Sequence, residues 1–377
     1  MKILIAPDSF KDCLSAQKVG EAIRNGIEGL PGNWNSQILP MADGGEGTVD
    51  ALIQATSGKI IYAEVFDPLM RPVRAKYGIL GDGKTAVIEM AAASGLELLQ
   101  EEERNPWVTT TYGTGLLIKA ALDEGCTRII LGIGGSATND GGVGMAQALG
   151  VKFLDTSGKS VILGGGELSR IEKIDIHEID PKIANCKIDV ACDVTNPLVG
   201  PEGSSVVYAP QKGANKKMVE ELDANLKHFA RVVKDQLGRD VEMIPGAGAA
   251  GGLGGGLLAF TRAELKPGFE IVRQETKLDD FVKQSDLIIT GEGRIDYQTQ
   301  FGKTPMGVTR VAKQYGKPVI AIAGTLGEGY PELYKLGFDA IFSIIDKPMT
   351  LKEALITAPQ LLERCAQSVI RLWMFDR

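Results

Sequence analysis

Glycines and short polar residues that could hold a phosphate group are concentrated between Arg128 and Gly144, in the sequence RIILGIGGSATNDGGVG. The apolar residues that open this stretch are typical of a short buried strand, and the apolar spacing from Val143 onward predicts a helix. Glycine lets the backbone approach a ligand closely, and a helix N-terminus attracts anions. The candidate phosphate-binding residues are Gly134, Gly135, Ser136, Thr138 and Asn139. A tight strand-to-helix turn with Thr138 or Asn139 as its N-cap accounts for the same residues equally well.

Carboxylates recur in turns that directly follow predicted strands: Asp8, Asp43, Asp193, Glu292 and Asp296. Ligands of open α/β sheets bind at the carboxyl ends of the strands. A carboxylate there can hold Mg²⁺ or accept a proton from a substrate hydroxyl. Each carboxylate taken alone is better explained as an N-cap or an Asx-turn, but their recurrence favours a shared function.

Basic residues stand beside these turns at Lys11, Arg294 and Lys303. Arginine matches a carboxylate or a phosphate with two parallel hydrogen bonds, whereas lysine acts as a point charge. The two histidines, His177 and His228, lie near no candidate nucleophile in the sequence, so Ser/His/Asp and Cys/His catalysis are poorly supported. Glycines, carboxylates, hydroxyls and a few cations fit phosphoryl transfer, which depends on positioning and charge neutralisation.

Two further glycine patterns resemble nucleotide-binding motifs. Residues 78–85 match G-x-x-x-x-G-K-T, but both flanks resemble strands and Asp82-Gly83 predicts a hairpin, so a phosphate loop is not expected. Residues 246–251 match G-x-G-x-x-G after Val241–Ile244, which could be a strand. A nicotinamide nucleotide site and close helix packing through small residues both remain open for this second pattern.

Composition limits the protein class. The 377-residue chain has a formal net charge of -7, which disfavours a nucleic-acid-binding surface. Its five cysteines include no C-x-x-C pair, which fits a reduced cytosolic compartment, and two histidines offer almost no material for a zinc site. The chain opens directly into a predicted strand and no apolar run reaches spanning length, so we expect a cytoplasmic protein without a membrane partner. The sequence does not distinguish a monomer from a homodimer.

The order of predicted elements indicates an α/β protein with a discontinuous first domain. Residues 1–62 read as strand, helix, strand, helix, and the same alternation resumes in 284–377. Together these segments predict a flavodoxin-like, doubly wound parallel sheet of five strands. Residues 63–283 are predicted to form a large inserted domain of mixed α/β structure.

The inserted region begins with a different pattern. Ile60–Phe66, Val73–Leu80 and Thr85–Met90 are strands too close together for intervening helices, so we expect antiparallel pairing. Further along, Lys216–Leu237 is predicted as an amphipathic helix and Gly246–Phe260 as a helix of small residues.

Several long motifs occur in one order along nearly the whole chain. They are APDSFKDCLSA (6–16), PMADGGEGT (40–48), EMAAASGLEL (89–98), IGGSATNDGG (133–142), ACDVTNPLVG (191–200), PGAGAAGG (245–252) and TGEGRID (290–296). With these motifs the sequence resembles the type-1 glycerate kinase family, the bacterial glycerate 2-kinases. The resemblance implies ATP- and Mg²⁺-dependent phosphorylation of D-glycerate to 2-phosphoglycerate, in glyoxylate, sugar-acid or allantoin breakdown. It also implies two α/β bodies, one flavodoxin-like and one resembling the restriction-endonuclease fold.

The resemblance does not assign roles to single residues, so the following roles are hypotheses. Gly134, Gly135, Ser136, Thr138 and Asn139 would hold the ATP phosphates, and Glu292 and Asp296 would hold Mg²⁺. Asp193 is the first candidate for deprotonating the glycerate hydroxyl, with Asp43 as the alternative, and Lys11 and Arg294 would bind the substrate carboxylate. Phosphorylation at C3 or of another small hydroxy acid, a nicotinamide-dependent oxidoreductase and a non-catalytic sugar-acid sensor are the competing interpretations.

Overall fold

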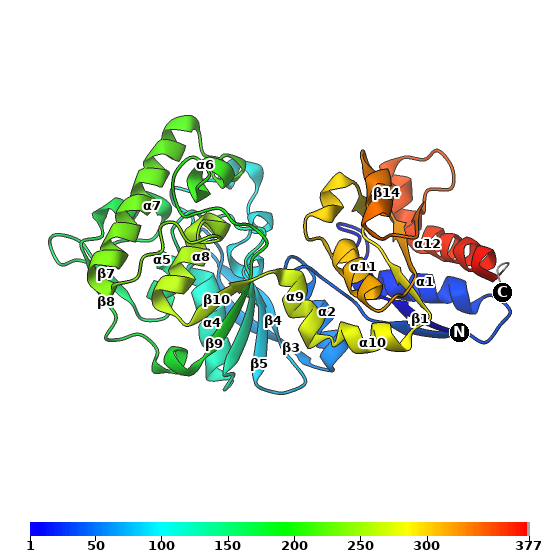
Figure 1. Ribbon diagram of the computed structural model, residues 1–377. Helices are drawn as coiled ribbons and strands as arrows, with labels where there is room; N and C mark the ends of the chain where they lie inside the picture. The colour runs from blue at the N-terminus through cyan, green and yellow to red at the C-terminus, as the bar shows by residue number, and fades with distance from the viewer. Residues whose placement is uncertain (375–377) are drawn as a thin grey trace. The chain divides into compact units, whose positions relative to one another are not determined.

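In the computed structural model, which describes residues 1–374, the internal contacts of the chain divide it into two units (Figure 1). Unit 1 comprises Met1–Asp43, Asp50–Thr56 and the chain from Phe269 onward, and unit 2 comprises Gly44–Val49 and Ser57–Gly268. This division differs from the predicted 1–62 plus 284–377 and 63–283 at both ends of the insertion. Residues 57–62 fall in unit 2 because the strand they enter pairs with the sheet of that unit, and 269–283 fall in unit 1 as helices.

Unit 1 is built on a five-stranded sheet in the order β2-β1-β11-β13-β15, with every neighbouring pair parallel. The strands are β1 (Lys2–Ile5), β2 (Asn35–Ile38), β11 (Leu287–Thr290), β13 (Val319–Ala323) and β15 (Ala340–Ser343). In chain order they lie as 2-1-3-4-5, a doubly wound arrangement that confirms the predicted parallel sheet. The central strands β11 and β13 are buried along their whole length, as is typical of parallel sheets that helices cover on both faces.

The helices of unit 1 pack on this sheet by their apolar faces. They are α1 (Ala16–Glu28), α2 (Thr48–Thr56), α9 (Gly268–Glu275), α10 (Leu278–Gln284), α11 (Thr304–Gln314) and α12 (Leu351–Met374). Ser15 caps α1, accepting a hydrogen bond from Lys18 N. One core joins Ile3 and Ile5 of β1 to α1 and α12. Short elements complete the unit: β12 (Arg294–Ile295), η6 (Tyr297–Gln300), β14 (Thr325–Leu326) and η7 (Tyr330–Leu336).

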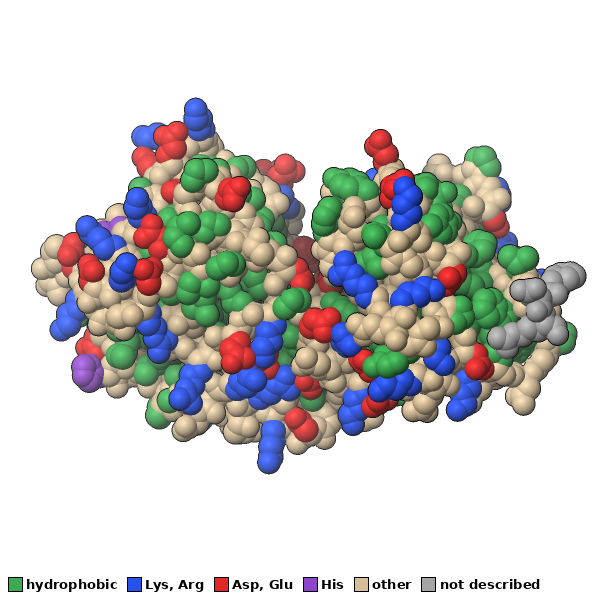
Figure 2. All heavy atoms as spheres, viewed as in Figure 1, with side chains coloured by type: hydrophobic (Ala, Val, Ile, Leu, Met, Phe, Trp, Pro, Cys, Tyr) green, Lys and Arg blue, Asp and Glu red, His purple; other side chains and the backbone are tan. Residues whose placement is uncertain are grey.

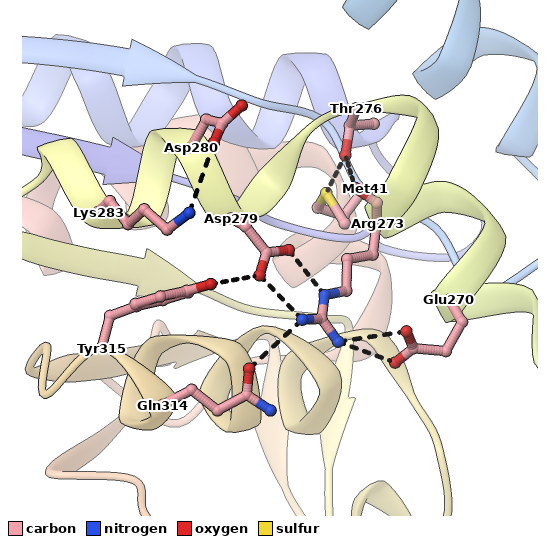
Figure 3. Close-up of polar contacts among 9 residues, drawn as sticks. All are labelled: Met41, Glu270, Arg273, Thr276, Asp279, Asp280, Lys283, Gln314 and Tyr315. Atoms are coloured by element: carbon pink, nitrogen blue, oxygen red, sulfur yellow. Dashed lines mark hydrogen bonds and ion pairs between the residues drawn. The ribbon is translucent and has the colours of Figure 1, made fainter.

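An ion-pair network ties α9, α10 and α11 together (Figure 3). Arg273 of α9 binds Asp279 of α10 through two hydrogen bonds, from Nε to Oδ2 at 2.8 Å and from Nη2 to Oδ1 at 2.9 Å. The hydroxyl of Tyr315 donates to the same carboxylate at 2.9 Å, and Gln314 of α11 accepts from Arg273. The bond with Arg273 lowers the pKa of Asp279 to about 2.

We expect Arg273→Met to lower the free energy of unfolding at pH 7 by about 2 kcal/mol, because Asp279 would keep its charge without its main partner. A carboxylate with a lowered pKa stabilises the folded state above its ordinary pKa, and this contribution is lost as the pH falls from about 4 towards 2. The loss of stability as the pH falls should therefore be smaller in Arg273→Met than in wild type. Urea unfolding at pH 7 and pH 3 measures both effects, and Lys335→Met, which removes an exposed partner of Glu332, serves as the control with little change.

Unit 2 is built on a six-stranded mixed sheet in the order β10-β9-β6-β5-β4-β3. The strands are β3 (Lys59–Phe66), β4 (Pro72–Ile79), β5 (Thr85–Glu89), β6 (Arg128–Gly132), β9 (Lys187–Ala191) and β10 (Ala263–Lys266), and β7 (Lys152–Leu154) pairs with β8 (Lys173–Asp175) separately. The first three strands pair antiparallel as predicted, and β5, β6, β9 and β10 run parallel.

The helical segments of unit 2 are mostly short. They are α3 (Ala91–Ser94), η1 (Leu96–Leu98), η2 (Glu101–Glu103), α4 (Tyr112–Asp123), α5 (Val143–Ala148), η3 (Gly165–Arg170), η4 (Pro181–Asn185), α6 (Ser204–Tyr208), η5 (Pro210–Lys212), α7 (Lys216–Leu237) and α8 (Ala249–Phe260). The bounds of α7 match the prediction. The predicted helix Gly246–Phe260 is wrong at its start, because Ala250, Gly251 and Gly252 have positive φ and interrupt the helix.

Surface charge and helix composition relate to the expectation of no nucleic-acid partner and no membrane partner. On the face shown in Figure 2, basic side chains are interspersed with acidic ones over each unit. Within residues 1–374, none of the helices combines the length and the apolar character needed to span a membrane.

Candidate functional site

The loop after β6 in unit 2 exposes its backbone at Gly134 and Gly135 and buries the side chains that follow. The short helix α5 begins after Gly142, which has a φ of 76°, so the interpretation of Thr138 or Asn139 as its N-cap is wrong. The carbonyl of Gly135 accepts from Leu96 N at 2.9 Å, and Ala137 N donates to Ser94 O at 2.9 Å. These two bonds fix the loop against the segment after α3.

Three consecutive backbone N–H groups of this loop, those of Gly134, Gly135 and Ser136, have no acceptor within the described part of the chain. Gly135 has a φ of 73°, a left-handed conformation that favours glycine. Successive N–H groups in such turns form nests that bind anions. The exposed backbone of Gly134 and Gly135 can therefore receive a phosphate oxygen.

The side chains of the same loop are engaged inside the protein. Ser136 Oγ accepts from Thr138 N at 3.1 Å, and Thr138 Oγ1 lies 3.1 Å from Ser136 Oγ. Asn139 Nδ2 donates to Ser205 Oγ at 3.0 Å, while Asn139 Oδ1 is buried without a partner. The predicted phosphate ligands thus divide into two exposed glycines and three buried side chains that shape the loop.

Sequence reasoning missed Lys212, the last residue of η5. Its side chain is buried, and Nζ donates to Ser136 Oγ at 3.1 Å and to Thr138 O at 2.7 Å. Burial lowers the pKa of Lys212 to about 7, although the negative charge of Asp140 acts in the opposite direction. In the sequence, Lys212 stands two residues after Pro210 and directly before Gly213, a context that resembles an ordinary surface turn.

Asp140 holds the far end of the loop and was also missed. Its buried carboxylate accepts hydrogen bonds from Thr111 N at 2.8 Å, from the Thr110 and Thr111 hydroxyls, and from Gly142 N and Gly144 N at 3.2 Å each. Burial raises the pKa of Asp140 despite these bonds. The carboxylate joins the loop to the start of α4 and to the first turn of α5.

We expect Asp140→Ala to lower the free energy of unfolding by about 3 kcal/mol, because several buried donors would lose their acceptor together. The matched control is Asp82→Ala, which removes an exposed carboxylate that accepts from Lys84 N, Thr85 N and Thr85 Oγ1. Calorimetric unfolding of both variants measures the difference. Equal losses would contradict the role given to Asp140.

The two other glycine patterns take structural roles. Residues 78–85 connect β4 to β5, which pair antiparallel, so the hairpin prediction is confirmed. Val241–Ile244 is not a strand, and the 246–251 pattern therefore lacks the element that a dinucleotide site requires. A Cβ on Gly251 would lie 1.9 Å from Thr138 O, so glycine is needed there for close packing against the phosphate-loop candidate.

In unit 1, three carboxylates from the carboxyl ends of neighbouring strands influence one another: Asp8 after β1, Asp43 after β2 and Glu292 after β11. Asp8 N donates to Gly291 O at 2.8 Å, which fixes these two turns side by side. Burial raises the pKa of Asp8 to about 7, and the charges of Asp43 and Glu292 add to the increase. Burial also raises the pKa of Glu292, with Asp43 adding to it and Lys303 opposing it.

Hydroxyls and one lysine complete this carboxylate group. Thr304 Oγ1, on the first residue of α11, donates to Asp8 Oδ2 at 2.5 Å. Glu292 accepts from Thr299 Oγ1 at 2.8 Å and lies 3.4 Å from Lys303 Nζ. Within residues 1–374, the His, Cys, Asp and Glu side chains form no cluster of three or more that could hold a metal ion unaided. A carboxylate with a pKa near 7 beside like charges is suited to accept a proton.

Arg294 and Asp296 form a separate pair in unit 1. Arg294 Nε donates to Asp296 Oδ2 at 3.0 Å, and Asp296 caps η6 by accepting from Gln298 N at 2.9 Å. The pair borders a cavity of about 390 Å³ together with Tyr297, Gln298, Lys303 and Glu328. The Arg294 side chain is 64% exposed, and within the described residues its Nη atoms have no hydrogen-bond acceptor. They can therefore bind an anionic ligand.

The remaining predicted residues occupy exposed loops. Asp193 lies in unit 2 after β9, where it accepts a hydrogen bond from Gly268 N, the first residue of α9, at 2.9 Å. Lys11 is exposed in unit 1, in the turn between Phe10 and Leu14 that follows β1. Their predicted roles in deprotonation and in substrate binding stay predictions.

Comparison with known proteins gives a consistent result. A sequence profile of the glycerate kinase family matches residues 3–374. The chain is 53% identical to a glycerate kinase of Halalkalibacterium halodurans over 367 residues, 97% of each protein, and 54% identical to the glycerate 2-kinase of Escherichia coli, covering 94% and 93% of the two chains. The solved structure of a putative glycerate kinase 2 from Salmonella typhimurium aligns with a TM-score of 0.91 at 48% identity, over 100% of this chain and 99% of that one. This chain belongs to the glycerate kinase family.

Proposed function

We propose that this protein transfers the terminal phosphoryl group of ATP to the C2 hydroxyl of D-glycerate, giving 2-phosphoglycerate. Family membership and the similarity to the Escherichia coli glycerate 2-kinase support the substrate and the position of transfer. The observation that carries the reaction class is the run of three unpaired N–H groups at Gly134, Gly135 and Ser136. Groups of this kind neutralise polyphosphate charge, which is the main catalytic requirement of phosphoryl transfer.

The acceptor hydroxyl is deprotonated, in this proposal, by Asp8. Its carboxylate combines a pKa of about 7 with two hydrogen bonds that orient it, from Thr304 Oγ1 and Ser9 N. A base with a pKa near the working pH is both unprotonated and basic enough to accept the proton. Asp43, the alternative base expected from the sequence, supports this role because its negative charge helps to raise the pKa of Asp8. Asp193 is the weaker candidate because it is exposed and accepts from the backbone at the start of α9.

The substrate carboxylate is bound by Arg294, with Lys11 contributing charge. Arg294 lines the cavity and keeps Nε on Asp296, while its Nη atoms have no acceptor within the described residues, so two hydrogen bonds to a carboxylate can form without breaking the existing pair. The cavity of about 390 Å³ exceeds what glycerate needs, so related hydroxy acids are reasonable alternative substrates.

Mg²⁺ supplied with ATP would neutralise charge on the transferred phosphates. Carboxylate oxygens are the ligands it prefers, and one or two of them suffice when phosphates and water complete its shell. Glu292 fits this role because it stands among carboxylates whose repulsion a cation would relieve. Asp296 fits less well, since Arg294 and the η6 cap already occupy its oxygens.

The finer descriptions of fold and setting belong to the same proposal. The 2-1-3-4-5 strand order supports a flavodoxin-like unit 1. For unit 2 we retain the restriction-endonuclease-like description that the family resemblance implies. A cytoplasmic location and a role in glyoxylate or sugar-acid breakdown follow from the same resemblance.

The experiment is incubation of the protein with MgATP and D-glycerate, followed by phosphorus NMR of the product. We expect ADP and 2-phosphoglycerate. A product phosphorylated at C3 would overturn the position of transfer, and turnover of another hydroxy acid alone would overturn the substrate. Binding of glycerate without ATP consumption would favour a sensor. Thermal stabilisation by NAD but not by ATP would favour an oxidoreductase.

A further inference from the structure

A lysine that the proposed reaction does not use is packed against the loop with the free N–H groups. Lys212 is 2% exposed, and its Nζ is bonded to Ser136 Oγ at 3.1 Å and to Thr138 O at 2.7 Å. Both acceptors belong to the segment that continues directly from Gly134 and Gly135. Both are also neutral, so the bonds hold the loop without neutralising the ammonium.

The ammonium of Lys212 has no paired carboxylate. Within residues 1–374, no carboxylate oxygen lies within 4.0 Å of Nζ, and the charged group that acts on it is Asp140. Asp140 directs its oxygens to Thr110, Thr111, Gly142 and Gly144 instead. A buried cation without a carboxylate partner is costly, so an anion bound nearby would stabilise its charged form.

We propose that Lys212 is a positioning residue of the nucleotide site, which holds Ser136 and Thr138 so that the adjacent N–H groups receive the phosphates and whose charge is balanced by the bound polyphosphate. The inference rests on the proposed function, because it assumes that the phosphates bind at this loop. It goes further because it states which residue holds the loop in shape and supplies a positive charge beside it. Lys212 acts through Ser136 and the backbone of Thr138, and contact with the ligand is not required.

A measurable consequence follows from the burial of Lys212. The pKa of about 7 leaves much of this lysine neutral above pH 7, and a bound polyphosphate would favour the charged form. Nucleotide binding should therefore take up a proton. The charged group that acts on Lys212 is Asp140, from the loop after β6, and the backbone of Arg104 packs against the neighbouring Gly213. The hydroxyls of Ser136, Thr138, Thr110 and Thr111 are neutral.

The test is titration calorimetry of MgADP at pH 7.5 in two buffers of different ionisation enthalpy, which measures protons taken up per site. Wild type should take up roughly half a proton or more. Lys212→Met should lose this uptake and bind about tenfold or more weakly, and Lys217→Met, which changes an 84% exposed lysine of α7, should behave as wild type. Melting without nucleotide reports whether each variant folds.

A second variant keeps the inference testable if Lys212→Met does not fold. Lys212→Arg retains the charge in a group that stays protonated, so it should bind MgADP without the proton uptake. Unchanged uptake in Lys212→Arg, or unchanged affinity and uptake in Lys212→Met, would overturn the inference. If the wild type phosphorylates glycerate while these variants bind as wild type does, the proposed function stands and the role of Lys212 fails. If the wild type transfers no phosphate, the proposed function fails.

Discussion

Asp8→Asn is expected to lower kcat about 10²- to 10⁴-fold while the KM for MgATP changes by less than about threefold. Asparagine preserves the shape of the side chain and can still accept from Thr304, but it cannot take the proton of the glycerate hydroxyl. The raised pKa means that the charged carboxylate destabilises the folded protein, so stability is lost as the pH rises from about 4 through about 7. The variant should therefore melt no lower than wild type at pH 8.

The pH profile adds an independent readout of the same residue. In wild type, kcat/KM for glycerate should rise with pH around a midpoint near 7, since Asp8 must be unprotonated to act as the base. Asp193→Asn is the matched control, because it changes a carboxylate that bonds Gly268 N in an exposed loop. If Asp193→Asn loses turnover and Asp8→Asn does not, the base is Asp193 and our assignment of Asp8 is wrong.

Arg294→Ala is expected to raise the KM for D-glycerate about 10- to 100-fold, with kcat at saturating glycerate much less affected. Arg294 lines the cavity with Nε held by Asp296, so its removal takes away the group that would bind the substrate carboxylate. Lysine restores the charge but not the paired hydrogen bonds, so Arg294→Lys should recover only part of the affinity.

Two controls show whether Arg294 acts on the binding of glycerate or on the binding of ATP. Arg310→Ala removes a nearby arginine that donates to Gln300 O, and it should leave the glycerate KM unchanged. Initial rates with each substrate varied in turn give both constants. A change confined to the KM for ATP would assign Arg294 to the nucleotide instead.

Local sequence patterns were sufficient for the parallel sheet of unit 1 and for the antiparallel strands of unit 2, and they drew attention to three carboxylates that influence one another. The alternation of short apolar runs with helical spacing predicted the parallel strands of unit 1, and closely spaced strands predicted β3, β4 and β5 as antiparallel. The rule that ligands meet the carboxyl ends of strands singled out Asp8, Asp43 and Glu292, whose charges influence one another in the structure.

The parts that failed depend on contacts distant in sequence. Lys212 is 76 residues from Ser136, and nothing near it indicates burial. The helix predicted from Gly246 is interrupted because Gly251 must pack against Thr138 O, a constraint that composition does not reveal. Residue type indicates which chemistry is available, and only the fold decides which atoms remain free for it.

The central claim is that the nucleotide phosphates bind the loop at Gly134, Gly135 and Ser136. A crystal structure of the protein with Mg²⁺ and a non-hydrolysable ATP analogue tests it directly. We predict phosphate oxygens within hydrogen-bond distance of these three backbone nitrogens, with Lys212 still bonded to Ser136 and Thr138. A triphosphate bound elsewhere, with the three N–H groups of this loop left without an acceptor, would contradict the account.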